Sequence, residues 1–265
     1  MFQMKMIDDK LVRKYSGAGN DFFVIDARGA DASEFRRPSV ISSLCSRTGG
    51  TGSDGLMLLS EGGDGADFRM EFFNPDGSGG MMCGNGGRCI VAFADDLGIT
   101  PSGDEFVFDA PDGRHRARIV SRDGALRVVR LQMLEPFGFR ECADGYFVNT
   151  GARHLVRFVP DVEAVDVAAE GPVFRHSPEF APEGVNVDFV QVCSDGSLRV
   201  LTFEKGVEGE TLACGTGIVA AAFVARRLSF VQGLSVKVQA RTDTLCVEFA
   251  PDSIWLTGPA LHCTL

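Results

Sequence analysis

The sequence predicts an α+β protein with two pseudo-symmetric domains, each a mostly antiparallel sheet wrapped around a central helix. Short segments rich in Val, Phe, Leu and Ile recur along the chain, bounded by Gly, Asp, Asn or Pro, which is typical of strands. Helical patterns are few. Cys-Gly-x-Gly occurs twice, at 83–86 and 214–217, each time after several strands and before an apolar helical pattern. This order indicates an internal duplication of two units.

The expected strands run through the whole chain. They cover residues 21–27, 55–60, 67–73, 105–110, 115–120, 125–131, 154–159, 187–192, 198–203, 235–240, 245–250 and 253–258. Apolar and polar residues alternate at 116–120 and at 198–203. This alternation predicts strands that keep one face in water.

Three segments have helical patterns, at residues 38–47, 87–98 and 217–228. The last two are hydrophobic on nearly every side, which predicts that both helices are buried. The midpoint of the duplication falls near Ser121–Leu126, so we expect one domain over residues 1–125 and a second over 126–258. We expect the ligand in the cleft between them.

The composition narrows the class of partner. A chain of 265 residues is long enough for two domains of ordinary size, and its net charge of −10 disfavours nucleic acid as a partner. No apolar run approaches the roughly 20 residues of a membrane span. The first ten residues lack the apolar stretch of a secretory signal, so we expect a cytoplasmic protein that does not contact membranes.

The eight cysteines have two different interpretations. In a cytosolic chain they are not expected to form a disulfide framework, and without a CxxC pair they predict no metal site. Most are expected to be small buried apolar residues, namely Cys45, Cys142, Cys193, Cys246 and Cys263. The two that precede glycines, Cys83 and Cys214, indicate chemistry.

A cysteine at a helix N-terminus meets unpaired N–H groups and the positive end of the helix dipole. Its thiol pKa is then expected to fall from about 8.5, so that thiolate forms near neutral pH. The same N–H groups can hold a carboxylate, and glycines allow a ligand to approach the backbone closely.

Two such cysteines facing each other predict epimerisation of a small amino acid without a cofactor. One sulfur would remove the α-proton while the other delivers a proton to the opposite face, and the loop N–H groups would stabilise the enolate-like charge. The residues alone leave two alternatives open. Cys83 and Cys214 could be ordinary turn residues, or they could serve a thiol redox or metal-binding protein.

The motifs together resemble diaminopimelate epimerases over most of the chain. Segments similar to the family's motifs occur in the family's order, at residues 14–26, 50–59, 70–78, 83–89, 184–190 and 203–217. The resemblance implies the same two-domain fold, a tail at 259–265 that returns to the first domain, and a homodimer. It also implies a cofactor-independent isomerase that interconverts LL- and meso-2,6-diaminopimelate, for lysine and peptidoglycan precursors.

The resemblance also assigns the site residues. It implies that Cys83 and Cys214 are the catalytic acid–base pair. Loop amides that hold the reacting carboxylate would come from Gly84, Asn85, Gly215 and Thr216. Further contacts to the substrate would come from Asn20, Asn74, Asn186, Glu204 and Lys205, with Glu204 at the ammonium group. His154 would lie near the first cysteine, and Arg153 is a further supporting candidate.

The departures from the family pattern cluster at the distal end of the substrate. Lys205 stands where the family has arginine, and a lysine cannot make the bidentate contact. Ala152 and Arg153 replace an asparagine and a proline, while Gly55 replaces a glutamine. Arg153 could supply the missing guanidinium. These changes leave open the alternative of a cofactor-independent racemase of another amino acid on the same fold.

Overall fold

The computed structural model describes residues 12–29, 31–48, 52–80 and 82–264. The chain divides into two compact units. Unit 1 runs to Leu131 and resumes at Pro259, and unit 2 spans Gln132–Gly258. Unit 1 ends at Leu131 rather than at residue 125, because β7 (Leu126–Met133) pairs with β6 (Gly113–Asp123) and so extends the sheet of that unit.

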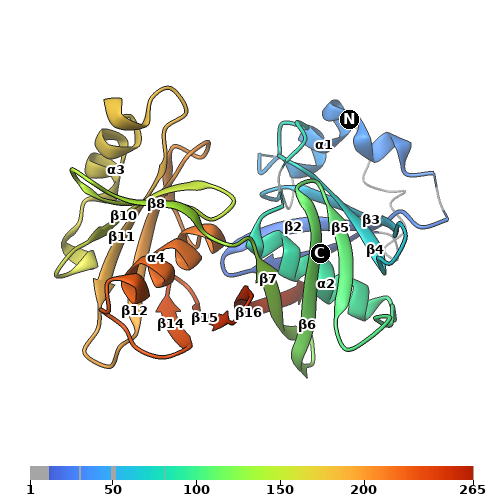
Figure 1. Ribbon diagram of the computed structural model, residues 1–265. Coiled ribbons are helices and arrows are strands. Elements are labelled where there is room, and N and C mark those ends of the chain that lie inside the picture. Colours follow the sequence, from blue (N-terminus) through green and yellow to red (C-terminus); the bar gives the residue numbers. More distant parts are fainter. Residues whose placement is uncertain (1–11, 30, 49–51, 81, 265) are drawn as a thin grey trace. The chain divides into compact units, whose positions relative to one another are not determined.

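Unit 1 wraps its strands around one long helix, α2 (Gly84–Asp96), which contacts β1, β2, β3 and β6 (Figure 1). Its other elements are β1 (Val12–Gly17), β2 (Asn20–Asp26), a 3-10 turn (Ser33–Arg36), α1 (Pro38–Cys45), β3 (Leu56–Glu61), β4 (Phe68–Phe73) and β5 (Phe106–Ala110). From β1 to β7, neighbouring strands pair antiparallel, parallel, antiparallel, parallel, antiparallel and antiparallel.

Unit 2 wraps its strands around α4 (Gly215–Arg227), which contacts β9, β10, β11, β12, β14 and β15. Its elements are β8 (Phe137–Cys142), β9 (Gly145–Asn149), β10 (Arg153–Phe158), α3 (Val167–Arg175), β11 (Asn186–Val192), β12 (Leu198–Glu204), β13 (Gly209–Thr211), β14 (Ser235–Gln239), β15 (Thr244–Ala250) and 3-10 turns at Val162–Ala164 and Pro178–Phe180. The last strand, β16, spans Ser253–Cys263.

The pairing pattern repeats between the units. From β9 through β10, β11, β12, β14 and β15 to β16, the pairs run antiparallel, parallel, antiparallel, parallel, antiparallel and antiparallel, as in unit 1. The central helix follows the fourth strand of this series in each unit. The predicted fold class, two pseudo-symmetric α+β domains with mostly antiparallel sheets, is therefore confirmed.

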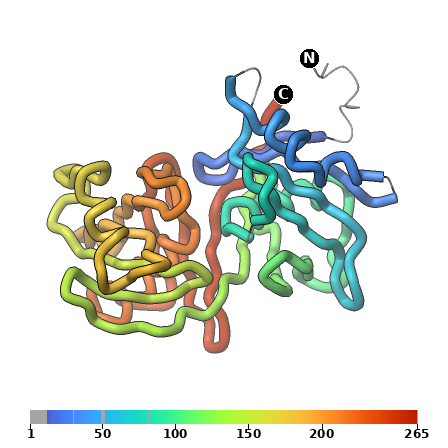
Figure 2. Tube along the Cα trace, turned by 90° about the horizontal axis from the view of Figure 1, so that it is seen from above, coloured from blue at the N-terminus to red at the C-terminus, as the bar shows by residue number. Residues whose placement is uncertain are grey.

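The C-terminal strand leaves unit 2 and joins unit 1. Its end pairs antiparallel with β1, where Lys14 lies opposite Cys263 and Ser16 opposite Leu261. Figure 2 shows this red end of the chain beside the blue N-terminal strands. The pairing fixes residues 259–263 to the first unit.

Both central helices are buried, as their apolar sequences predicted. Every residue of α2 from Gly84 to Ala94 is buried, and α4 buries nine of its thirteen residues. The prediction for 116–120 is also correct, since buried and exposed residues alternate in β6. The prediction of a wet face at 198–203 is wrong, because β12 packs against both α3 and α4.

The cysteines outside the two motifs differ in burial. Cys45 is buried as expected, but Cys142, Cys193, Cys246 and Cys263 are only half-buried. Cys142 and Cys263 end their strands, Cys193 lies in a turn, and Cys246 lies on the partly exposed face of β15. All eight cysteines are free thiols.

Candidate active site

Cys83 is the N-cap of α2, as the sequence predicted for a cysteine that opens a helix. Its Sγ accepts a hydrogen bond from the backbone N–H of Gly86 at 3.2 Å. A side chain at Gly86 would bring a Cβ atom to 3.3 Å from this sulfur, so the glycine leaves room for the cap. The sulfur therefore lies at the positive end of the helix dipole.

A directed chain of hydrogen bonds holds the loop of Cys83. Arg88 Nη2 donates to Asn85 Oδ1 at 2.7 Å, and Asn85 Nδ2 donates to Asn20 Oδ1 at 2.7 Å. Asn20 Nδ2 in turn donates to Asp54 Oδ2 at 3.1 Å. Because the cation fixes one amide and that amide fixes the next, the chain has a single direction from Arg88 to Asp54.

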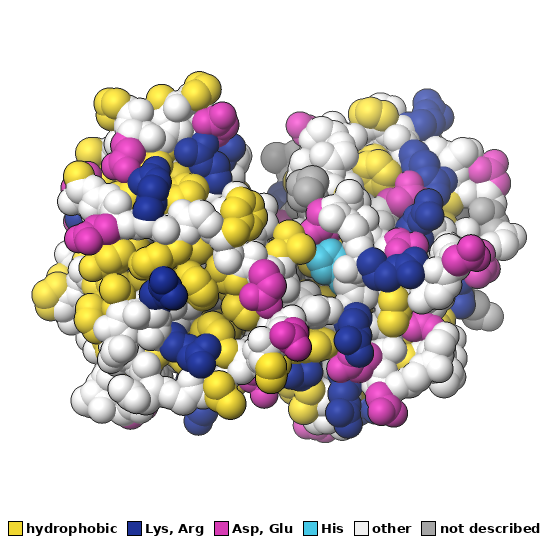
Figure 3. Space-filling view, viewed as in Figure 1, with side chains coloured by type: hydrophobic (Ala, Val, Ile, Leu, Met, Phe, Trp, Pro, Cys, Tyr) yellow, Lys and Arg dark blue, Asp and Glu magenta, His cyan; other side chains and the backbone are white. Residues whose placement is uncertain are grey.

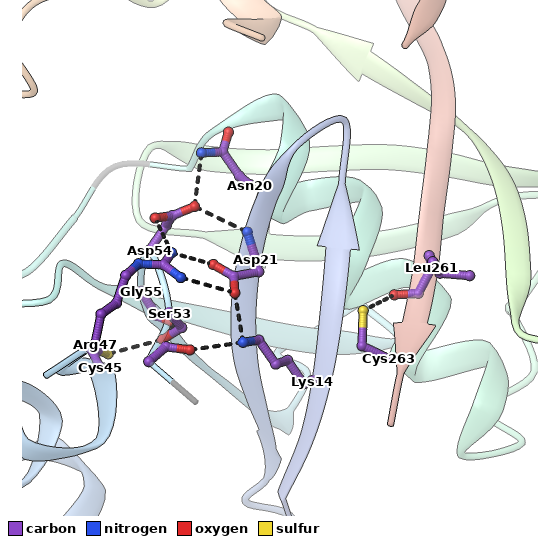
Figure 4. Close-up of polar contacts among 11 residues, drawn as sticks. Lys14, Asn20, Asp21, Cys45, Arg47, Ser53, Asp54, Gly55, Leu261 and Cys263 are labelled. Carbon is purple, nitrogen blue, oxygen red and sulfur yellow. Dashed lines mark hydrogen bonds and ion pairs between the residues drawn. The ribbon is translucent and has the colours of Figure 1, made fainter. Parts of the chain in front are cut away.

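Charged residues support the far end of this chain (Figure 4). Arg47 contacts both Asp21 and Asp54 at 2.6 Å, and Lys14 contacts Asp21 at 2.6 Å. Burial opposes ionisation of Asp21, yet hydrogen bonds and charge from Arg47 and Lys14 hold the pKa of its carboxyl below the usual value. Asn20 is thus anchored by an ionised cluster.

Cys214 is the N-cap of α4, and its Sγ lies 3.4 Å from Thr216 Oγ1. Burial raises the pKa of this thiol well above its ordinary value, and the negative charges of Glu204 and Asp188 raise it further. The backbone N–H of Gly217 acts in the other direction. The expectation of a lowered pKa at the helix N-terminus is therefore wrong for Cys214, because desolvation outweighs the helix dipole.

A second buried network lies behind Thr216. His154 Nε2 lies 3.0 Å from Thr216 Oγ1, and His154 Nδ1 lies 2.7 Å from Asp188 Oδ2. Thr202 Oγ1 donates to the other carboxylate oxygen of Asp188 at 2.8 Å. His154 and Asp188 are both fully buried. The network repeats the arrangement of unit 1, in which the residue two positions after the cysteine also bonds to the beginning of a neighbouring strand.

The packing around Gly217 explains why the second motif ends in glycine. A Cβ atom at this position would lie 2.4 Å from Asp188 Oδ1 and 3.2 Å from Thr202 Oγ1. Only a residue without a side chain allows α4 to pack this closely on the carboxylate of Asp188.

The residues predicted for the distal end of the substrate in unit 2 bond mainly to one another. Asn186 Oδ1 accepts the backbone N–H of Lys205 at 2.8 Å, and its Nδ2 donates to the carbonyl of Arg153 at 3.3 Å. Arg153 forms an ion pair with Glu183 at 2.6 Å. The side chain of Lys205 is exposed, and we find no ion-pair partner for it in the described part of the chain. Lys205 is the available cation here.

In unit 1, Asn74 lies in a turn after β4, where its Nδ2 donates to Ser78 Oγ at 3.0 Å. Gly55 lies against the same strand end. A Cβ atom there would lie 2.8 Å from the carbonyl oxygen of Phe73 and 3.1 Å from the ring of Phe72. The local packing therefore favours glycine at a position where the resemblance implies glutamine.

Each unit thus gathers part of the predicted site. Unit 1 places Asn20, Cys83, Gly84 and Asn85 together, and unit 2 places His154, Asn186, Cys214, Gly215 and Thr216 together. The sequence also predicts that His154 lies near Cys83. Because these two residues belong to different units, their proximity stays a prediction. Sequence reasoning did not identify four polar residues that hold these groups, Asp54, Arg88, Asp188 and Thr202.

Two further findings concern the described residues alone. Across residues 12–29, 31–48, 52–80 and 82–264, we find no group of three or more His, Cys, Asp or Glu side chains suited to hold a metal ion. In those same ranges no helix is long and apolar enough to cross a membrane.

Comparison with known proteins identifies the family. The model of the diaminopimelate epimerase family matches residues 12–134 and 146–262. The chain belongs to the diaminopimelate epimerase family. It is 43% identical to diaminopimelate epimerase of Chlorobaculum tepidum over 253 residues, which cover 92% of this chain and 96% of the relative. Diaminopimelate epimerase of Aquifex aeolicus is 39% identical over 263 residues, with 92% of each chain covered. The predicted enzyme class, an epimerase among the isomerases, is confirmed.

Solved structures share the fold at low sequence identity. A PhzF-family phenazine biosynthesis protein of Bacillus anthracis has a TM-score of 0.72 at 14% identity, with 96% of each chain covered. A hydroxyproline epimerase of Agrobacterium vitis has a TM-score of 0.68 at 16% identity, with 96% of this chain and 88% of that chain covered. These likenesses confirm the fold class.

Proposed function

We propose that the protein interconverts LL- and meso-2,6-diaminopimelate by two-base proton transfer between Cys83 and Cys214, without a cofactor. The reaction would supply precursors of lysine and peptidoglycan. One observation carries the proposal: each unit presents a cysteine as the N-cap of a buried helix, followed by Gly-x-Gly. The curated relatives, named diaminopimelate epimerases over nearly their whole length, support the choice of substrate.

The first requirement of the reaction is a more acidic α-carbon. Backbone N–H groups at Gly84, Asn85, Gly215 and Thr216 belong to the first turns of α2 and α4, where helical amides have no partner within the helix. A carboxylate held by such amides carries part of the charge that develops when the α-proton leaves. Stabilisation of this enolate-like charge lowers the barrier to proton removal.

The second requirement is one proton acceptor and one proton donor on opposite faces of the α-carbon. A thiolate removes the α-proton and becomes a thiol, while the other thiol donates its proton and becomes a thiolate. The bonds balance, since one C–H bond breaks as another forms, and the sulfurs exchange roles. The raised pKa of Cys214 supports its role as the initial donor, and the cap on Cys83 supports the thiolate there.

The remaining predicted contacts orient the amino acid. Glu204, at the end of β12, would hold the reacting ammonium group, and the exposed Lys205 would meet the distal carboxylate. Asn74 and Asn186 would complete the distal end. Their side chains already take part in hydrogen bonds, so their expected role is to shape this end of the site.

Exchange of the α-proton in deuterated water tests the proposal. The purified protein is incubated with diaminopimelate and with a panel of other amino acids, and deuterium at the α-carbon is measured by mass spectrometry. We expect exchange with diaminopimelate to be the fastest. Much faster exchange with another amino acid would reject the proposed substrate but keep the chemistry. The double variant C83S/C214S serves as the control for contamination, because each single variant keeps one base.

A racemase of another amino acid is the second candidate. It is favoured by the altered distal residues, Ala152, Lys205 and Gly55, and by the packing that favours glycine at position 55. The same panel decides between the two candidates, because this alternative predicts a substrate without a second amino-acid end.

We also propose a homodimer, which the family resemblance implies. Hydrophobic side chains gather on one face of unit 2 (Figure 3), and exposed apolar surface favours association. Phe137 is 60% exposed and Val173 is 66% exposed in this unit. Light scattering behind a sizing column measures the mass directly, and a monomer at micromolar concentration would reject this proposal.

A further inference from the structure

A buried hydrogen-bonded chain in unit 2 ends at the sulfur of Cys214. It runs from Asp188 to His154 at 2.7 Å, from His154 to Thr216 at 3.0 Å, and from Thr216 Oγ1 to Cys214 Sγ at 3.4 Å. All four residues belong to unit 2. Asp188 and His154 are fully buried, so their charge and proton positions are set by these partners.

The amide of Asn186 fixes the proton on the ring of His154. Asn186 Oδ1 accepts the backbone N–H of Lys205 at 2.8 Å, which turns Nδ2 towards the carbonyl of Arg153 and towards His154 Nε2 at 3.4 Å. An amide nitrogen only donates, so Nε2 must be an acceptor. The ring proton therefore lies on Nδ1 and points to Asp188.

This tautomer sets the direction of the remaining bonds. The Thr216 hydroxyl donates to His154 Nε2 and presents its lone pairs to Cys214, so Cys214 is the S–H donor. We propose that Asp188 and His154 are positioning residues that keep Cys214 protonated, so that the unliganded enzyme holds Cys214 as its proton donor. The term proton donor rests on the proposed two-base function, whereas the thiol state does not.

The charges around the sulfur support the same state. The charged groups that act on Cys214 are Glu204, at the end of β12, and Asp188, on β11, and both disfavour a thiolate. Burial acts in the same direction. With its ring proton on Nδ1, as these hydrogen bonds indicate, His154 on β10 adds no opposing charge.

Unit 1 has a buried cation beside its cysteine loop, although its chain also ends at a carboxylate, Asp54. Its chain begins at the cation of Arg88, which also donates to the carbonyl of Gly84 at 3.1 Å, directly after Cys83. Both chains end at a carboxylate, and the first cysteine loop has in addition an arginine bonded directly to it. This asymmetry fits an enzyme that rests with one thiol ready to donate.

The first test needs no variant of the network. Nitrogen-15 NMR of the ring nitrogens distinguishes the two neutral tautomers of histidine, and the chain has only four histidines. The resonances of His154 are assigned by their loss in H154Q. We expect a protonated Nδ1 and an unprotonated Nε2 near neutral pH. A protonated Nε2 would overturn the proposal.

The second test uses D188N to reverse the direction of the hydrogen bonds between residue 188 and Cys214. The hydroxyl of Thr202 donates to the new amide oxygen, so the amide N–H faces His154 Nδ1 and moves the ring proton to Nε2. The ring then loses its 3.4 Å contact with Asn186 Nδ2, which is the longest of its hydrogen bonds. Thr216 then donates to the sulfur and stabilises a thiolate. Alkylation of Cys214 by iodoacetamide, followed by peptide mass spectrometry at about pH 8, should accelerate about tenfold, equivalent to one pKa unit.

The double variant D188N/T216V distinguishes two effects of D188N on the alkylation rate, the reversed hydrogen bonds and the loss of a negative charge. Without the hydroxyl of Thr216, only the loss of the carboxylate charge can act, so D188N should accelerate alkylation at most about threefold in the T216V background. Equal acceleration in both backgrounds, or none in the first, would overturn the proposal. D195N, which removes a carboxylate from an exposed turn of unit 2, should leave the rate unchanged.

Neither test uses a substrate, so the outcome is independent of the proposed reaction. Epimerisation of diaminopimelate is measured separately on the same preparation. If the tautomer and the alkylation rates are as expected but the protein does not act on diaminopimelate, only the proposed substrate is rejected. Normal epimerisation with an Nε2-protonated His154 would reject the positioning role alone.

Discussion

Arg88 Nη2 donates to Asn85 Oδ1 at 2.7 Å although the side chain of Arg88 is fully buried. The same guanidinium donates to the carbonyls of Gly84 at 3.1 Å and Pro259 at 3.2 Å. One buried cation thus holds the loop of Cys83 and the returning C-terminal strand. Unit 1 depends on this cation for the geometry of its half-site.

R88M should therefore be severely destabilising. It leaves two buried acceptors and the half-buried carbonyl of Pro259 without this donor. Breaking a buried charged network typically costs about 3–5 kcal/mol of the free energy of unfolding. Urea unfolding followed by circular dichroism measures this loss. The matched control is R118M, which removes an exposed arginine from β6 and should change stability by less than about 0.5 kcal/mol. Equal losses in both variants would contradict the role of Arg88.

G217A tests the close packing of α4 on Asp188. The added Cβ atom would lie 2.4 Å from Asp188 Oδ1, so helix and strand must separate. We expect a loss of about 1–3 kcal/mol in the free energy of unfolding, typical of overpacking, together with slower epimerisation. G209A in the same unit places its Cβ atom in open space and should be nearly neutral. A G217A protein as stable and active as G209A would refute this packing argument.

The free energy of unfolding should decrease as the pH rises above about 8.5. Burial raises the pKa of Cys89, so this thiol stays protonated in the folded protein while it ionises in the unfolded chain. The unfolded state then binds fewer protons, and each such thiol contributes a slope of at most about −1.4 kcal/mol per pH unit. The stability is thus full below the ordinary thiol pKa and falls towards the raised value.

C89A checks this assignment. Unfolding in urea at several values between about pH 8 and pH 10 should give a flatter dependence than in the parent protein, because one thiol no longer differs between the states. The midpoint itself will be lower, since alanine leaves a small cavity. Identical pH slopes in the two proteins would show that Cys89 does not contribute.

The distal carboxylate should contact Lys205 rather than Arg153. Arg153 is held in an ion pair with Glu183 at 2.6 Å, whereas Lys205 is exposed. K205M should raise KM for diaminopimelate about tenfold, which corresponds to loss of one charge-assisted contact, with a smaller change in kcat. R153M should have a weaker effect. A larger increase of KM in R153M than in K205M would reverse this assignment.

The two cysteines that we propose as the acid–base pair should each be indispensable for epimerisation. C83S and C214S are expected to lose about a thousandfold or more in kcat, because serine is a much weaker acid and general acid–base catalysis contributes on this scale. Each variant should still eliminate a good leaving group from a β-substituted substrate, which needs only one base. C142S, at a half-buried surface position, is the control and should keep its activity.

The sequence predicted the helices around which each unit is built, because continuous apolar patterns at 87–98 and 217–228 can only be buried. It did not predict α3 (Val167–Arg175), where Gly171 and Pro172 interrupt the pattern although Asp166 caps the helix. It also missed β1, β8, β9 and β13. Strand β8 has no buried residue, and its exposed positions include Phe137 as well as charged residues, so its apolar pattern does not alternate.

The motifs located both cysteines as helix caps, since Cys-Gly-x-Gly has a local meaning. They could not reveal Arg88 and Asp188, whose importance depends on burial and on partners distant in the chain. A signal was present in each case, because each charge interrupts an apolar helix or strand. The pKa of Cys214 was predicted in the wrong direction, since desolvation depends on tertiary packing and cannot be read from a motif.

In the proposed reaction, two sulfurs act on opposite faces of one α-carbon. The most direct measurement is the position of deuterium at low conversion when LL-diaminopimelate is epimerised in deuterated water. We expect the meso product to carry solvent deuterium at one α-carbon while recovered LL substrate remains unlabelled, because separate groups remove and deliver the proton. Deuterium in recovered substrate at the same rate as in product would indicate a single base and would rule out the two-sulfur reaction.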